Sequence, residues 1–241
     1  MSKHSFPILM YHSIAKFPKG TPMRSLHVSP KLFLCQMRIL KWLGYRGVSM
    51  SELMPYLIGE KVGKVVGITF DDGYKNNLSH ALPILKKFSF TATCYLVSQN
   101  IGGNNYWDLE KGIPENPIMN KTEVFEWLSN GMEIGSHSQN HIRLSEYSKF
   151  DFSREISNSK HDLESTFNCN VNHFCYPYGD YNEQIISEVK SAGYESATTV
   201  NRGKASPKDN IHELPRVFIT HRTLAHLFLM KVLSNYENKR R

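Results

Sequence analysis

Two adjacent carboxylates follow an apolar stretch in the first third of the chain. The stretch KVVGITF, residues 64–70, is typical of a buried strand and ends at Asp71, Asp72 and Gly73. Neighbouring carboxylates repel each other, and folding is penalised unless a cation or a shared proton relieves the repulsion. A strand-ending Asp-Gly turn would explain these residues without any chemistry. Active sites in parallel α/β sheets are built at the C-terminal ends of strands, however, and this position favours a functional role.

Two histidines four residues apart form a second candidate group. His137 and His141 enclose the segment HSQNH, which follows a predicted strand at residues 132–136. If the chain turns helically after that strand, the two imidazoles meet on one face. Two histidines and one carboxylate match the open three-ligand sites of catalytic zinc. The pair alone is often incidental, but together with Asp72 it predicts a divalent metal site. The expected ion is Zn²⁺, with Co²⁺ or Ni²⁺ as alternatives.

The third candidate is a rigid turn after another strand, YPYGD, residues 176–180. Proline and glycine fix the backbone there and could aim the amide N–H of Tyr178 into a site, where a developing oxyanion needs a donor. An ordinary strand-ending turn with a packed tyrosine explains the motif equally well when it is taken alone.

These motifs lie within a regular alternation of β-like and amphipathic stretches. Strand candidates occupy residues 7–11, 64–70, 91–97, 132–136, 173–176, 195–200 and 214–220. No internal repeat or Ser/Gly-rich linker interrupts the pattern. The alternation predicts one α/β domain, residues 1–241, with a parallel sheet that is open or closed into a barrel.

Amphipathic segments between the strands predict the helices. Ser29 and Pro30 are typical of a helix cap and its first position. A long helix is expected to begin at Ser145. Further helices are predicted around residues 78–85, at residues 123–128 and at residues 223–233.

Four motifs in this order resemble the polysaccharide deacetylases, which are also called NodB-homology or carbohydrate esterase family 4 enzymes. The motifs are ITFDDGY, EIGSHSQNHIRLS, YPYG and ELPRVFI, and the resemblance extends from ILMYH near the start to LPR near residue 216. It implies a distorted (β/α) barrel of about seven parallel strands. It also implies a metal-dependent deacetylase that acts on N-acetylated amino sugars in an oligo- or polysaccharide or a lipid-linked precursor.

The resemblance also implies roles for single residues. Asp71 would be the general base, Asp72, His137 and His141 the metal ligands, and the Tyr178 amide the oxyanion donor. A divalent metal lowers the pKa of a bound water to about 7, which suits hydrolysis at neutral pH. The departing amine is a poor leaving group and must be protonated as it leaves.

Two departures from the family pattern require substitutes. The usual third motif has an arginine where this chain has Cys175, and Arg216 in LPR is the candidate replacement for orienting the base. No Leu-x-His motif supplies the usual general acid. In the subgroup that resembles the poly-N-acetylglucosamine deacetylases a histidine in an N-terminal YH segment takes that role, and His12 matches it. A hydrogen-bonded structural histidine is the alternative. His221 and His226 are rivals, and His226 is expected to be packed.

Aromatic residues near the motifs are candidate sugar contacts, because flat apolar sugar faces pair with aromatic rings. They are Tyr74, Tyr106, Trp107 and Tyr176. Tyr106 and Trp107 lie in a segment, residues 98–117, that is too long and too rich in Gly, Asn and Pro to be a simple connector. Their alternative role is to anchor this loop to the body of the protein.

Composition limits the remaining function classes. Of 241 residues, 40% are hydrophobic and 21% charged, which excludes a disordered chain. No apolar run approaches the ~20 residues of a membrane-spanning helix, and the N-terminus lacks the features of a secretory signal. We therefore expect a cytoplasmic protein or a processed chain. The four cysteines form no CxxC pair and are expected to be free.

The formal net charge of +7 favours an anionic partner such as an acidic glycan or a membrane surface. Nucleic acid is not expected, because no helix-turn-helix, zinc or RNP signature is present. The sequence leaves the oligomeric state open. It also leaves open a small-molecule amide or imide hydrolase on the same barrel, or a non-catalytic glycan-binding relative.

Overall fold

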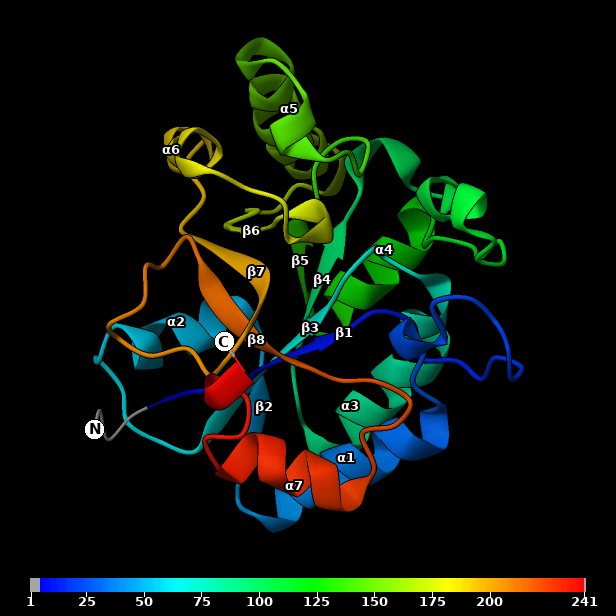
Figure 1. Ribbon diagram of the computed structural model, residues 1–241, viewed down its shortest axis with the longest axis vertical. Helices are drawn as coiled ribbons and strands as arrows, with labels where there is room; N and C mark the ends of the chain where they lie inside the picture. The colour runs from blue at the N-terminus through cyan, green and yellow to red at the C-terminus, as the bar shows by residue number, and fades with distance from the viewer. Residues whose placement is uncertain (1–4, 241) are drawn as a thin grey trace.

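Seven parallel strands close into a barrel in the computed structural model, which describes residues 5–240 (Figure 1). In order around the barrel they are β1 (Ile8–Tyr11), β3 (Val65–Phe70), β4 (Thr93–Leu96), β5 (Glu133–Ser136), β6 (His173–Cys175), β7 (Ser196–Arg202) and β8 (Leu214–Phe218). Because β1 pairs with both β3 and β8, the sheet has no gap. The predicted distorted α/β barrel of about seven parallel strands is confirmed.

An eighth strand lies outside this closed ring. β2 (Arg46–Val48) pairs with the first half of β3, at Val65–Gly67, and β4 pairs with the last two residues of β3. The two strands therefore share one edge of β3. β2 is followed by α2 (Met50–Leu57). Neither element was predicted, because a strand of three residues gives almost no periodicity and Pro55 interrupts the helical pattern.

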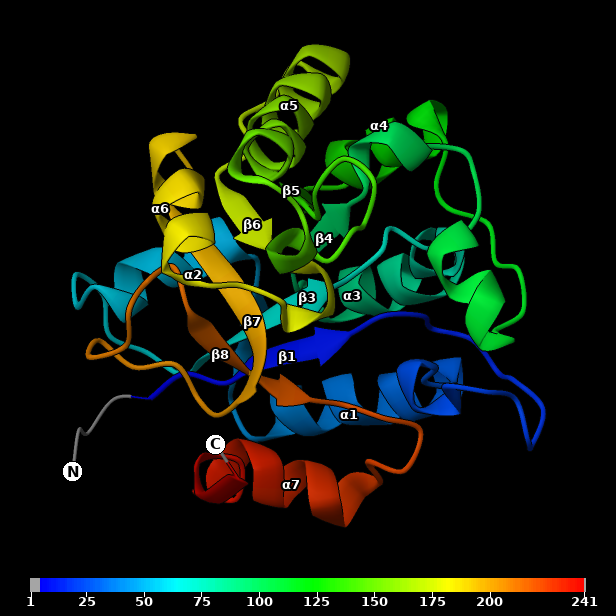
Figure 2. The same cartoon turned by 45° about the horizontal axis from the view of Figure 1, so that its top comes forward.

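Helices cover the outside of the barrel (Figures 1 and 2). In both views α1 (Pro30–Trp42), α3 (Leu82–Phe88) and α7 (Ala225–Leu233) lie on one side, whereas α5 (Lys149–Phe167) and α6 (Glu183–Ser191) lie on the other. α4 (Lys121–Ser129) lies beside β4 and β5. As predicted, α1 begins at Pro30, and the Ser29 hydroxyl accepts from the Leu32 amide at 3.2 Å.

The alternation of side chains along the strands divides the core into two clusters. Leu9 and Tyr11 of β1 belong to the cluster under the surrounding helices, whereas Ile8 belongs to the cluster inside the barrel. Met50, Leu53 and Leu57 of α2 join this inner cluster. α2 therefore packs against the barrel interior, and the opposite end of the barrel, where the strands terminate, is left for polar residues.

Two helix predictions need correction. α5 begins at Lys149, with Ser148 as its cap, because Ser145 lies in a short 3₁₀ turn, Leu144–Glu146. Ser145 instead binds Asp180 through both its amide and its hydroxyl. His226 is exposed on α7 and not packed.

All four cysteines are free, as predicted; Cys94 and Cys175 are buried, and Cys35 and Cys169 are half-buried. None of the helices in the described part of the chain is long and apolar enough to cross a bilayer.

Candidate metal centre and catalytic pocket

The end of β3 delivers the two adjacent aspartates to the polar end of the barrel. Both are almost fully buried, at 2% and 3% exposure for Asp71 and Asp72. Asp72 adopts a left-handed backbone conformation, with φ 71°, and Gly73 follows with φ 78°. A Cβ at position 73 would lie 2.8 Å from the Leu96 side chain, so the turn has no room for a larger residue. The turn allows the carboxylates of Asp71 and Asp72 to contact different residues.

Asp72 lies between the two predicted histidine ligands. Its Oδ1 is 3.5 Å from Nε2 of His137 and 3.3 Å from Nε2 of His141. One ligand atom from each residue falls within 4.8 Å of the other two, and all three residues are buried. Burial raises the pKa of Asp72, but hydrogen bonds from the two histidines outweigh it and hold the pKa well below its ordinary range. One carboxylate facing two imidazole nitrogens is a donor set that suits a divalent transition metal.

The histidines meet through an irregular turn and not through the helical turn that the spacing predicted. Ser138 and His141 both have positive φ, at 65° and 55°. The Ser138 hydroxyl accepts from the His141 amide at 3.0 Å and closes the turn. The turn is not helical because the short polar side chain of Ser138 accepts from the backbone in place of a helical hydrogen bond.

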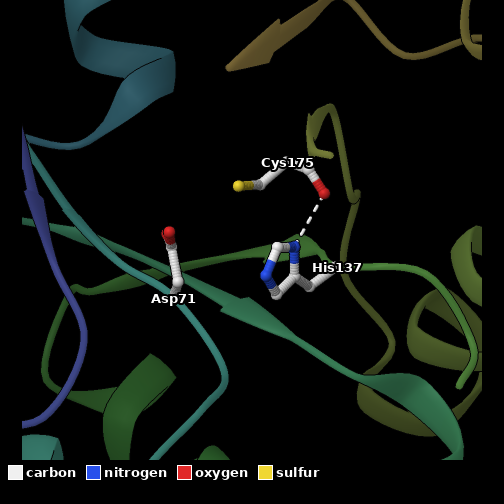
Figure 3. Close-up of side chains that lie close together, drawn as sticks. All are labelled: Asp71, His137 and Cys175. Carbon is white, nitrogen blue, oxygen red and sulfur yellow. Dashed lines mark hydrogen bonds between the residues drawn. The ribbon is translucent and has the colours of Figure 1, made fainter. Parts of the chain in front are cut away.

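Both histidine rings are oriented by neighbouring groups. Nδ1 of His137 donates to the backbone carbonyl of Cys175 at 2.7 Å, which leaves Nε2 free to face Asp72 (Figure 3). The Trp107 indole stacks on the His141 ring, with centroids 4.4 Å apart and planes within 18°. Figure 3 also shows Asp71 close to His137 and Cys175, so the candidate base and one candidate ligand share a single wall of the site.

Arg216 binds the other aspartate. Its Nη1 and Nη2 donate to the two oxygens of Asp71 at 2.7 and 2.8 Å, and its Nε donates to the carbonyl of Thr199 at 2.8 Å. Burial raises the pKa of Asp71, but the charge of Arg216, helped by His12, outweighs it and keeps the pKa below its ordinary value. Nη2 also contacts the sulfur of Cys175 at 3.3 Å. The guanidinium of Arg216 therefore lies beside Cys175, which stands where the motif was expected to have an arginine.

His12 lies at the end of β1, beside Asp71. Its Nε2 is 3.7 Å from Oδ2 of Asp71, and 15% of its side chain is exposed. Among the described residues nothing accepts from or donates to its buried Nδ1. Asn77 fixes the backbone here by donating to the His12 carbonyl at 2.9 Å. Asn77 opens a π-helical segment, Asn77–Ala81, a rare backbone form that is frequent at functional sites.

The predicted turn after β6 places Tyr178 in a left-handed backbone conformation. Tyr178 has φ 58°, and the Gly179 amide donates to the carbonyl of Tyr176 at 2.9 Å. The Tyr178 ring packs edge-on against His141 at 4.6 Å. Lys111 and Arg143 lie over the same ring, at 4.4 and 4.5 Å from its centroid.

These groups open into one pocket of about 360 Å³. Its lining includes Asp71, Asp72, His137 and His141 together with His12 and Tyr178. Trp107 and Tyr176 also line it, although the Tyr176 hydroxyl is already bonded to the carbonyl of His212.

Two of the four aromatic candidates lie outside the pocket lining. Tyr74 is 1% exposed, and its hydroxyl bonds Asp72, so it supports that carboxylate from within the protein. Tyr106 donates to the carbonyl of Asn140 at 2.8 Å, which is the anchoring role. His221 lines a different pocket, and His226 lines neither.

Three cationic side chains at the pocket were missed in the sequence. They are Lys111, Arg143 and Arg202. Arg202 is the last residue of β7, so the rule that strand ends carry functional groups would have found it. Arg143 follows His141 by two residues and was within the recognised motif. Lys111 comes from the long loop and had no local signal.

Comparisons with known proteins agree on one family. A family model described as polysaccharide deacetylase matches residues 59–197. Poly-β-1,6-N-acetyl-D-glucosamine N-deacetylase of Staphylococcus aureus is 26% identical over an alignment of 235 positions that covers 91% of this chain and 80% of that protein. The Bacillus subtilis protein YxkH, whose name assigns it to the polysaccharide deacetylases, is 30% identical over 216 residues. The match covers 89% of this chain and 71% of YxkH.

A solved structure gives the same result. Streptococcus pyogenes deacetylase PplD, solved in complex with acetate, matches with a TM-score of 0.81 at 28% identity, covering 95% of this chain and 98% of PplD. The range matched by the family model contains Asp71, Asp72, His137 and His141, whereas His12 and Arg216 lie outside it.

Proposed function

The chain belongs to the polysaccharide deacetylase family, and we propose that it is a metal-dependent N-deacetylase of N-acetylglucosamine residues in an oligo- or polysaccharide or its lipid-linked precursor. The convergence of Asp72, His137 and His141 is the observation that carries this proposal. Their two imidazoles and one carboxylate would hold a divalent ion, with Zn²⁺ the best match and Co²⁺ or Ni²⁺ as alternatives. Such an ion would supply Lewis-acid chemistry, by polarising the acetyl carbonyl and activating water near neutral pH.

Asp71 acts as the general base in this proposal. Its carboxylate lines the pocket and takes the proton of the attacking water. The bidentate bond from Arg216 keeps Asp71 ionised and fixes the plane of the carboxylate. Arg216 is therefore a positioning residue, because its guanidinium is buried behind Asp71 and does not line the pocket.

Tyr178 and His12, which both line the pocket, stabilise the developing negative charge and supply the proton for the leaving group. As the water oxygen adds to the acetyl carbon, the carbonyl oxygen gains negative charge, and the backbone N–H of Tyr178 donates to it. The C–N bond then breaks, and His12 gives its proton to the departing nitrogen. The products are a free amine and acetic acid, which ionises to acetate by releasing the second proton of the water to solvent, and the first proton, held on Asp71, reprotonates His12 for the next cycle.

Acetate release with and without a chelator tests the proposal. The substrates are N-acetylglucosamine oligomers, lipid-linked and nucleotide-linked N-acetyl sugars, and a small N-acetylated amine. We expect oligomer hydrolysis to stop with chelator and return with Zn²⁺. His141→Ala should abolish the rise in melting temperature on adding Zn²⁺, whereas His226→Ala, an exposed histidine, should retain it.

Two results would contradict the proposal. Acetate release that ignores the chelator would remove the metal from the reaction. Faster hydrolysis of the small amide than of every sugar would favour a small-molecule amidase on this barrel.

A further inference from the structure

A second pocket, separate from the catalytic pocket, lies on the same end of the barrel. It has a volume of about 290 Å³, and its lining includes Lys16, Phe17, Arg24, His27, Ser29 and His221. These residues come from the segment after β1 and from the loop after β8. Figures 1 and 2 both show that loop, in orange, passing beside the blue segment that precedes α1.

A short stretch of backbone forms the wall between the two pockets. Met23 and Leu26 line the catalytic pocket, whereas Arg24 and His27 line the second one. Val28 donates to the carbonyl of Ser13 at 2.9 Å, and Ser13 and His27 form an isolated parallel bridge. His27 is therefore held beside the strand end that carries His12.

His27 is buried in a way that no partner within the described chain explains. It is 2% exposed, and neither ring nitrogen has a hydrogen-bond partner among the described residues. The Phe17 ring stacks on it with centroids 3.7 Å apart, which fixes the plane of the imidazole. Nδ1 of His221 is likewise buried without a partner in the same described region. A buried imidazole without partners costs stability unless a ligand satisfies it.

The charged residues that line the second pocket are all basic. Lys16 and Arg24 are its charged residues, and no described residue that lines it is acidic. Burial, reinforced by the charge of His12, lowers the pKa of His27 to about 4, although Asp72 opposes this shift. The neutral imidazole therefore offers one N–H donor at neutral pH. A guanidinium, an ammonium and an imidazole N–H together suit an anion such as a phosphate group.

We propose that this second pocket binds a phosphate group carried by the glycan whose N-acetyl group occupies the catalytic pocket. The inference rests on the proposed function and narrows its substrate to a phosphorylated or phosphodiester-linked glycan. Because residues 23–27 contribute side chains to both pockets, a glycan with its N-acetyl group in the catalytic pocket would carry the phosphate on a neighbouring part of the same molecule.

Phosphate binding is tested first, without substrate. Inorganic phosphate titrated into the full chain should shift the ring ¹⁵N signals of His27 and raise its pKa, because an anion favours the imidazolium. Arg24→Gln should weaken phosphate binding about tenfold, the loss expected for one charge-assisted hydrogen bond. Lys19→Gln, an exposed lysine of the same loop, is the matched control and should bind as the wild type does. Unshifted His27 signals would overturn the inference.

Substrate preference is tested second, with N-acetylglucosamine tetramers that differ only in one terminal phosphate. The ratio of kcat/KM for the phosphorylated over the neutral tetramer should exceed one and fall about tenfold in Arg24→Gln, mainly through KM. An unchanged ratio would contradict the assignment. Arg24-dependent binding to anionic phospholipid vesicles without any preference between the tetramers would assign the pocket to a lipid headgroup instead. If neither tetramer is deacetylated, the proposed function fails, and the phosphate titration still decides whether the pocket binds anions.

Discussion

Arg216 on β8 binds both carboxylate oxygens of Asp71 at the end of β3, although β1 separates the two strands in the sheet. The guanidinium reaches Asp71 past Thr69, whose hydroxyl accepts from Nη1 at 3.1 Å. Both partners are buried, so neither can exchange the other for water. The geometry of the candidate base is therefore set by a residue that lies 145 positions away in the chain.

Replacing Arg216 by lysine distinguishes the contribution of its charge from that of its hydrogen-bond geometry. Arg216→Lys keeps a cation but loses the planar bidentate bond. We expect kcat/KM to fall on the order of 100-fold, because small displacements of a catalytic group have costs of this size. The free energy of unfolding should fall by about 1–3 kcal/mol in a denaturant titration. Arg222→Lys, in the exposed loop after β8, is the control. Wild-type turnover in Arg216→Lys would show that Asp71 needs only a nearby charge.

If His12 is the general acid, the effect of replacing it depends on the leaving group of the substrate. If His12 protonates the departing nitrogen, His12→Gln should lower amide hydrolysis about 10²–10⁴-fold. An activated ester such as 4-nitrophenyl acetate needs no such proton and should lose far less. His161→Gln, an exposed histidine on α5, should leave both reactions unchanged. Metal content is measured in parallel. Equal losses on the amide and the ester would assign His12 a structural role.

Glu237 near the C-terminus links stability to pH. It is fully buried, binds Arg202 at 2.7 and 2.9 Å and also binds Lys231. Burial raises its pKa, but Arg202 and Lys231 outweigh it and bring the pKa below its ordinary value of 4.5. A carboxyl group whose pKa is lowered on folding stabilises the protein above its unfolded pKa, and this contribution is lost as pH falls through the folded pKa.

Glu237→Gln should therefore lower the free energy of unfolding by about 3 kcal/mol at pH 7, because Lys231 and Arg202 lose their anion. The difference from wild type should shrink as pH falls below 4.5. Chemical unfolding at several pH values measures it, with the exposed Glu60→Gln as control. A difference that stays constant down to pH 3 would contradict the assigned charge.

The parts of the fold that were predictable from the sequence have local signals. β3 and β4 are short apolar runs bounded by polar turns. Ser29 and Pro30 indicate a helix start because a serine caps the helix and a proline suits its first position. β2 was not predictable, because it is specified by its pairing with β3. Gly47 of β2 shows this dependence, since a Cβ there would lie 2.5 Å from the Ile68 side chain.

Some contacts of the candidate site were likewise predictable from the sequence, and others were not. Asp72, His137 and His141 were found by type and spacing, although the turn that joins the histidines is not helical. The contact between Arg216 and Asp71 was anticipated only because the family resemblance showed that an arginine was missing at Cys175. The stacking of Trp107 on His141 and the burial of His27 have no signal in sequence, because each depends on packing between distant segments.

The sequence allows Trp107 either to bind sugar or to anchor its loop, and its stacking on His141 favours anchoring. The indole covers one face of a candidate ligand and limits how the imidazole can rotate, as other groups around metal ligands do. Trp107→Ala should therefore lower Zn²⁺ affinity about tenfold in a competition titration with a chromophoric chelator. Tyr106→Phe, which removes only the bond to Asn140, is the matched control for movement of the loop. If Trp107→Ala instead raises KM for the oligomer and leaves Zn²⁺ affinity unchanged, the indole binds sugar, because only that role changes substrate affinity without changing the metal site.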